Sequence, residues 1–195
     1  MNTQHQMSKA ARWITAVAAL MMIGVYFFPL WKISLDAPQY PEGLEMHIWV
    51  HQITGDRPNT LENINLLNHY IGMQPIEPDA IPELRYMPYI VVLLMIIGLI
   101  VAWAGRRKWL MIWLLLFVIV AVIGLVDFYL WEYDYGHNLD PSAPLKLLDS
   151  YQPPLIGYKQ LLNITAGSFP HIGGWILVAS LVLGITAWLL DSRTS

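Results

Sequence analysis

The chain has 195 residues, of which 56% are hydrophobic, 12% aromatic and 13% charged, and it contains no cysteine. Soluble domains carry about 25% charged residues, so this composition favours a membrane protein. The missing cysteines exclude a disulfide scaffold, a thiol nucleophile, an iron–sulfur protein and a cysteine-ligated zinc site. A net charge of −3 without a basic run argues against nucleic acid as a partner.

Four apolar stretches, in chain order, are each long enough to cross a membrane as a helix. A hydrocarbon core of about 30 Å needs about 20 helical residues, and a backbone in lipid has to satisfy its own hydrogen bonds. Tryptophans such as Trp13, Trp31 and Trp131 lie at the ends of these stretches, as is typical of membrane interfaces. We therefore predict membrane-spanning helices over residues 13–30, 88–104, 109–131 and 174–190.

Basic residues predict the orientation of these helices. Six of them lie beside the helix ends on one side, among them the turn at residues 106–108, against the single acid Asp191. The long segments 32–86 and 132–172 instead hold eight and four acidic residues. Because basic residues accumulate on the cytoplasmic side, we expect both termini in the cytoplasm and both long loops outside. The first stretch is too long for a cleaved signal peptide, so we expect an uncleaved anchor.

The two long loops share a short pattern. In both, a Leu-Leu-Asn triplet is followed at identical spacing by a glycine and a proline, although chance convergence would give the same result. We interpret the pattern as a duplication of two halves, residues 1–105 and 106–195, with a short amphipathic helix in each loop. The predicted fold class is an all-α integral membrane four-helix bundle with two duplicated halves and ordered periplasmic loops. The matching residues are Leu66-Leu67-Asn68, Gly72 and Pro75, and Leu161-Leu162-Asn163, Gly167 and Pro170.

Histidines and a methionine of the loops are the candidate metal ligands. His47 and His51 are four residues apart, as are His69 and Met73, and on a helix such pairs share a face. Imidazole combined with thioether suits copper, whose monovalent form favours soft sulfur. The predicted copper ligands are His47, His51, His69 and Met73, with His137 and His171 as less favoured candidates.

Other interpretations of these residues remain open. The histidines could simply form hydrogen bonds in a cap at the membrane surface, and His137 lies in a turn-like segment rich in Gly, Asn and Asp. His171 could anchor the fourth helix at the interface. Asp127 is the one acid inside a predicted span and is therefore a functional candidate. The sequence shows no catalytic constellation, so we expect no enzymatic activity.

Several longer runs resemble an uncharacterised family of small bacterial membrane proteins. These runs are 37–44, 53–55, 64–73, 135–141 and 151–157, and the similarity covers nearly the whole chain. The family is associated with gene clusters for nitrous oxide reductase, the periplasmic copper enzyme of denitrification. It has no established activity, so the resemblance implies only a setting: a bacterial inner membrane, with the reductase or its copper-delivery proteins as partners.

The predicted function combines this setting with the histidine pattern. We expect an accessory protein that binds or hands over copper at the periplasmic face during maturation of nitrous oxide reductase, with acidic loops that attract the ion. The first alternative is a metal-free membrane scaffold or electron-transfer adaptor that docks a periplasmic redox partner. The second is a quinol-site subunit that uses Asp127 and His171 for protons.

Overall fold

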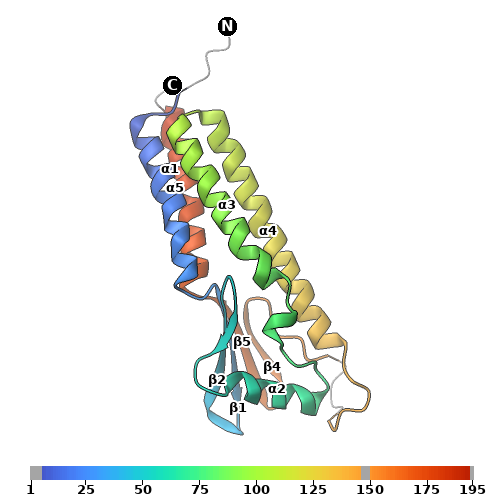
Figure 1. Cartoon of the computed structure of the whole chain (residues 1–195). Coiled ribbons are helices and arrows are strands. Elements are labelled where there is room, and N and C mark those ends of the chain that lie inside the picture. Colours follow the sequence, from blue (N-terminus) through green and yellow to red (C-terminus); the bar gives the residue numbers. More distant parts are fainter. Residues whose placement is uncertain (1–5, 146–149, 194–195) are drawn as a thin grey trace.

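Four long helices form one end of the molecule and a β-sheet forms the other (Figure 1). The computed structural model describes residues 6–145 and 150–193, with side chains up to Asp191. Helix α1 begins and helix α5 ends at the end of the bundle that lies farthest from the sheet (Figure 1). The two segments that connect helices at the opposite end therefore lie on the same side of the bundle.

Each of the four predicted apolar stretches forms a helix. The helices are α1 at Lys9–Met21, continued by the 3₁₀ helix η1 at Met22–Tyr26, then α3 at Glu83–Ala104, α4 at Arg107–His137 and α5 at Ile172–Arg193. All four are long and apolar enough to cross a membrane, by length and composition. The first ends at Tyr26 and not at residue 30, because Pro29 lacks an N–H group and disfavours helical geometry in the residue before it.

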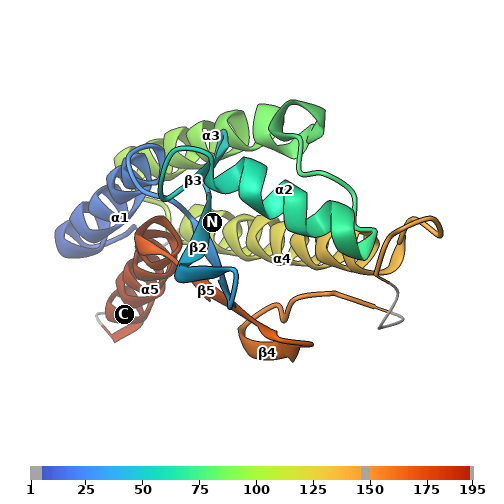
Figure 2. The same cartoon turned by 90° about the horizontal axis from the view of Figure 1, so that it is seen from below.

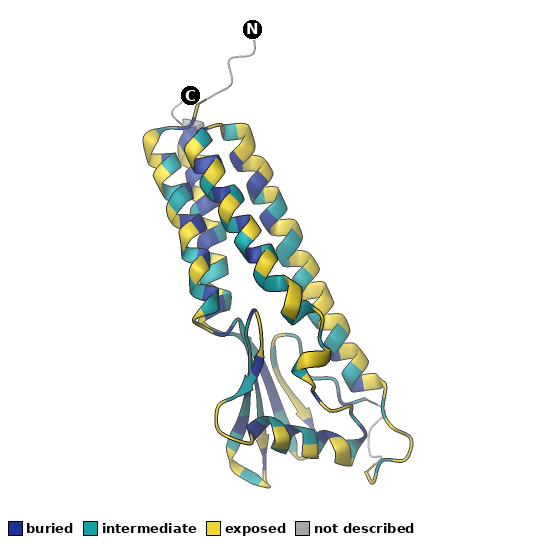
Figure 3. Ribbon diagram, in the orientation of Figure 1, coloured by how far each residue is buried: buried dark blue, intermediate teal, exposed yellow. Residues whose placement is uncertain are grey.

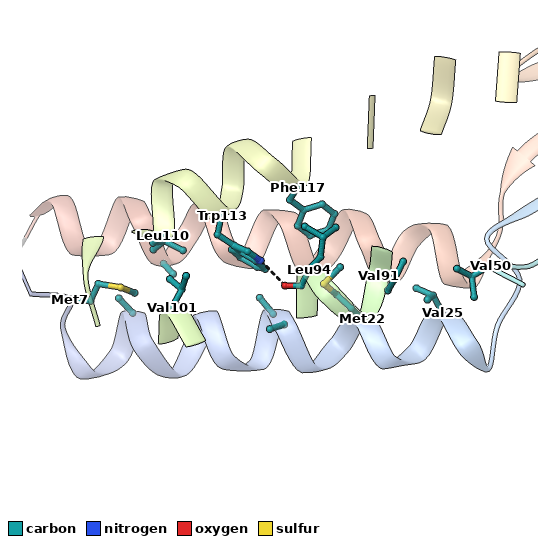
Figure 4. Packing of buried hydrophobic residues seen from close by; sticks show 14 residues of the cluster. Met7, Met22, Val25, Val50, Val91, Leu94, Val101, Leu110, Trp113 and Phe117 are labelled. Atoms are coloured by element: carbon teal, nitrogen blue, oxygen red, sulfur yellow. Dashed lines mark hydrogen bonds between the residues drawn. The ribbon is translucent and has the colours of Figure 1, made fainter. Parts of the chain in front are cut away.

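The bundle is held together by small residues and one buried tryptophan. Trp113 of α4 is completely buried, and its indole N–H donates a hydrogen bond of 2.9 Å to the carbonyl of Leu94 in α3 (Figure 4). A Cβ atom at Gly98 would lie 2.8 Å from both Ala19 and the Trp113 ring, so a glycine is needed where α1, α3 and α4 meet. The outward sides of the helices remain exposed and apolar, as expected for a lipid-facing surface (Figure 3).

The all-α prediction is wrong, because the two long loops build one five-stranded antiparallel sheet. Its order is β3-β2-β1-β5-β4. The strands are β1 at Trp31–Ala37, β2 at Tyr40–Ile48, β3 at Ile53–Gly55, β4 at Gly157–Leu161 and β5 at Ile164–Pro170. Central strand β1, from the first loop, pairs with β5 of the second loop, for example Ile33 with Ser168. The described parts of the two loops thus share one sheet.

Apolar residues explain which side of the sheet is buried. Along β1 the residues alternate between apolar and polar, so that Ile33 and Leu35 face inward with Met46 of β2, while Lys32 lies on the other face. Helix α2, Thr60–Ile71, lies beside β2 and β3 (Figures 1 and 2) and packs Ile64 against the inner face. A short 3₁₀ helix, η2 at Pro78–Ala80, follows before α3.

The duplicated pattern has two different structures. Leu66-Leu67-Asn68 lies in α2, as predicted, and the helix ends at Gly72, whose φ of 81° suits glycine. Leu161-Leu162-Asn163 instead ends β4 and turns into β5, so the amphipathic helix predicted for the second loop is wrong. The two halves therefore do not share a common loop structure.

A carboxyl group fixes the start of α2 to the sheet. Asp56 accepts hydrogen bonds from the Thr60 hydroxyl at 2.9 Å, the Arg57 guanidinium at 2.9 Å and the backbone N–H of Glu45 at 3.3 Å. Burial raises the pKa of Asp56, but these hydrogen bonds and the Arg57 charge outweigh it and leave the pKa below its ordinary value. The ionised carboxylate therefore stabilises the junction between β3 and α2.

Candidate functional site

The four predicted copper ligands lie on different elements. His47 belongs to strand β2, and His51 lies in the turn between β2 and β3, where it is exposed. The ring of His51 lies 6.2 Å from that of Trp49. The expectation that His47 and His51 share a helical face is wrong, because the strong alternation of this segment places it in the sheet.

His69 and Met73 are separated by the end of helix α2. His69 is exposed in the last turn of the helix. The left-handed conformation of Gly72 then redirects the chain, so that Met73 leaves the helix and lines an apolar cavity on the inner side of the sheet. The two side chains therefore have different surroundings, and the common helical face predicted for them does not form.

His137 is used locally at the end of α4. Its ring stacks on that of Tyr133 with 3.9 Å between centroids, and its Nδ1 lies 2.9 Å from the Tyr133 carbonyl. Asp127, the candidate acid inside the predicted span, is exposed on the surface of the same helix. Neither residue joins a cluster of ligand-type side chains within the described parts of the chain.

Two histidines from different loops do meet at the sheet. His47 of β2 and His171, which directly follows β5, flank strand β1, and their ring centroids are 5.3 Å apart at an angle of 51°. The Nε2 atom of His47 lies 3.6 Å from a carboxylate oxygen of Glu45, whose other oxygen accepts a 2.9 Å hydrogen bond from Lys32. The pair thus lies where the two loops join.

The environment of His171 favours a neutral imidazole. Its Nδ1 atom is buried and has no hydrogen-bond partner among the described residues. Burial lowers the pKa of His171, and the nearby His47 and Lys32 lower it further, against a smaller opposite effect of Glu45. At neutral pH the ring is therefore uncharged, which is the form that binds metals.

This pair is a limited donor set. Within residues 6–145 and 150–191, no three or more His, Asp or Glu side chains are grouped to hold a metal ion. The two imidazoles fit a copper(I) ion, which accepts few ligands and binds nitrogen donors, better than they fit zinc or calcium, which need four or more. Whether copper binds stays a prediction.

A second feature was not predicted from the sequence: a cavity of about 80 Å³ between the inner face of the sheet, α2 and the end of α4. It is lined almost entirely by apolar side chains, together with the carboxyl group of Glu132, which is 1% exposed. One sequence signal could have revealed this burial. Glu132 lies four residues after Phe128 and three before Tyr135, and therefore on an apolar face of the helix.

No family model matches the sequence, and no curated protein matches it.

Proposed function

We propose that the chain is a membrane-anchored accessory protein that holds a copper(I) ion between His47 and His171 and hands it to a partner protein. The observation that carries the proposal is the approach of these two rings, 5.3 Å apart, from two loops far apart in the sequence. The resemblance to proteins of nitrous oxide reductase gene clusters suggests the setting, a bacterial inner membrane with the sheet on the periplasmic side. There the recipient would be the reductase or its copper-delivery proteins.

The surroundings of the pair support transfer over permanent storage. Two imidazole ligands bind copper(I) less tightly than three or four, so the ion remains exchangeable. Glu45 next to His47 is paired with Lys32, so these neighbours add little net charge that would hold a cation in place. His51, His69 and Met73 contribute no ligand to this pair in the proposal, which revises the predicted donor set.

The direct test measures copper(I) binding by the full-length protein in detergent, with a chromophoric chelator as competitor. His47→Ala and His171→Ala are expected to weaken binding at least tenfold each, because each removes half of the donor set. His51→Ala and His69→Ala are matched controls, since both rings are exposed and lie outside the pair. Equal affinity for all four variants, or no binding by the wild-type protein at micromolar copper, would contradict the proposal.

The second candidate is a docking surface that binds no metal. His47, Lys32 and Phe169 lie side by side across β2, β1 and β5, on the face of the sheet opposite the cavity. Tyr158, 71% exposed, packs edge-on against Phe169 at 5.0 Å, so this face carries an aromatic pair open to a partner. Two variants tested in cells separate the candidates. If Tyr158→Ala lowers reductase activity while the copper sites of the reductase stay filled, docking is favoured. If His47→Ala loses reductase activity and added copper restores it, the copper function is favoured.

A further inference from the structure

The Glu132 cavity lies between the sheet, α2 and the end of α4, and it is independent of the histidine pair. Strand β1 contributes Ile33 and Leu35, helix α2 contributes Ile64 and Leu67, and β4 and β5 close the remaining side. Helix α4 extends past the end of α3 toward the sheet and brings Glu132 to this position (Figure 1). At about 80 Å³ the cavity is roughly half the size of the ~150 Å³ cavity known to hold benzene, so it has room for about three to five non-hydrogen atoms.

The carboxyl group of Glu132 has no partner in this cavity. Both of its oxygens are buried and lack a hydrogen-bond donor among the described residues. Among the described residues that line the cavity there is no lysine, arginine or histidine. Apart from Trp131 and the tyrosines, Asn68 is the one other polar side chain among the described lining residues, and it donates its amide hydrogen bond to the carbonyl of Gln74. An isolated buried carboxyl group is costly, and proteins retain such groups where a ligand completes them.

Aromatic rings indicate the kind of ligand. Trp131, Tyr135 and Tyr151 line the same cavity as Glu132, and the rings of Trp131 and Tyr135 are 4.4 Å apart. Aromatic rings beside a carboxylate can bind an ammonium group, which lies against the ring faces and donates a charge-assisted hydrogen bond to the carboxylate. Water would fill this space poorly, because a buried water needs two to four polar partners and the lining offers few.

We propose that this cavity binds the ammonium group and short alkyl chain of an alkylamine, with the nitrogen at Glu132 and the chain against the aliphatic side chains of β1 and α2. The site is separate from the proposed copper pair and shares no residue with it. The same chemistry could come from a free alkylamine or from the ethanolamine headgroup of a membrane lipid.

The test titrates n-butylammonium into the full-length protein in detergent and follows calorimetric heat together with thermal unfolding. The wild-type protein is expected to bind and to unfold at higher temperature as the ligand concentration rises. The neutral isostere 1-butanol is expected to bind at least tenfold more weakly. Two results would overturn the proposal. One is equal binding of butanol and butylammonium, and the other is no butylammonium binding at 10 mM, roughly the weakest affinity that is still useful.

Three variants separate the site from nonspecific binding. Glu132→Gln keeps the shape of the side chain and is expected to lose butylammonium binding at least tenfold while staying folded, because the carboxyl makes no hydrogen bond within the described part of the chain. Glu62→Gln, at an exposed position of α2, is the matched control and is expected to bind like the wild type. Leu67→Phe fills the cavity, keeps Glu132 and is also expected to weaken binding. Wild-type affinity in both Glu132→Gln and Leu67→Phe would overturn the proposal.

A lipid arm identifies the source of the ammonium group. The butylammonium titration is repeated in nanodiscs of phosphatidylethanolamine and of phosphatidylcholine. A lower apparent affinity for butylammonium in phosphatidylethanolamine than in phosphatidylcholine, if this difference disappears in Glu132→Gln, supports a headgroup that competes for the cavity. Equal affinity in both lipids, with Glu132 still required, supports a free amine as the ligand.

Discussion

Gly136, one turn beyond Glu132 in α4, is a position where a single added methyl group would clash with backbone atoms. A Cβ atom there would lie 2.4 Å from the Cα and 2.5 Å from the N of Gln152. Ordinary contacts begin at 3.4 Å, so the segment that holds Gln152 would have to move by about 1.0 Å. This shift would also stretch the 2.9 Å hydrogen bond from the Tyr151 N–H to the Gly136 carbonyl.

The two effects of Gly136→Ala have opposite signs. Alanine stabilises a helix by about 1 kcal/mol relative to glycine. Against this, overpacking costs about 1–3 kcal/mol, and a weakened hydrogen bond costs about 1 kcal/mol more. Because the clash is with backbone atoms that cannot rotate away, the two destabilising effects outweigh the gain in helix propensity. We expect a net loss of about 1–3 kcal/mol in the free energy of unfolding.

The same helix offers a matched control in Gly124. A Cβ atom there would meet only the Met87 side chain, at 3.7 Å, so Gly124→Ala is expected to be neutral or to stabilise by up to about 1 kcal/mol. Urea titration of both variants in detergent, followed by tryptophan fluorescence, measures the difference. If Gly136→Ala proved as stable as Gly124→Ala, the packing of the 150–152 segment against α4 would be wrong.

Two further predictions concern the sheet and the membrane. Because the pKa of Asp56 is lowered in the folded protein, its stabilising effect is complete above the unfolded pKa of about 4 and is lost as the pH falls through the lower folded value. Circular dichroism between pH 6 and pH 2 should therefore show a smaller acid-induced loss of stability for Asp56→Asn than for the wild type, and identical pH profiles would contradict this role. Since the chain has no cysteine, Lys108→Cys and Gln160→Cys provide unique labelling positions. In intact spheroplasts, a membrane-impermeant maleimide is expected to label only Gln160→Cys, and labelling of Lys108→Cys alone would reverse the predicted orientation.

The long helices were predicted correctly from the sequence. The strands were not predicted, although the sequence contains a signal for them. Hydropathy alone located the four long helices, because a run of about 20 apolar residues has few other structures available to it. The segment from Trp31 to Ala37 alternates strictly between apolar and polar residues, which is the period of a half-buried strand. The segment lies in a loop between two predicted membrane helices, and the sequence prediction assigned no strands to the loops. The predicted all-α class was therefore wrong.

The candidate sites depend on contacts that the sequence does not specify. His47 meets His171 only because β1 pairs with β5, and no local pattern encodes a pairing between strands so far apart in the chain. The copper prediction relied on helical spacing and therefore grouped His47 with the wrong neighbour. Glu132 and the exposed Asp134 are only two residues apart in α4, and the apolar face that holds Glu132 is covered only when the sheet and α2 pack against it.

The pairing of β1 with β5 has a consequence for biosynthesis. Strands β1 to β3 emerge early, yet the β1 edge that β5 covers remains open until residues 164–170 have been made. An uncovered edge strand in the centre of a future sheet readily pairs with another chain. A protein truncated before residue 164 would thus expose the unpaired edge of β1. The hairpin of β4 and β5 therefore protects the complete chain from aggregation through that edge.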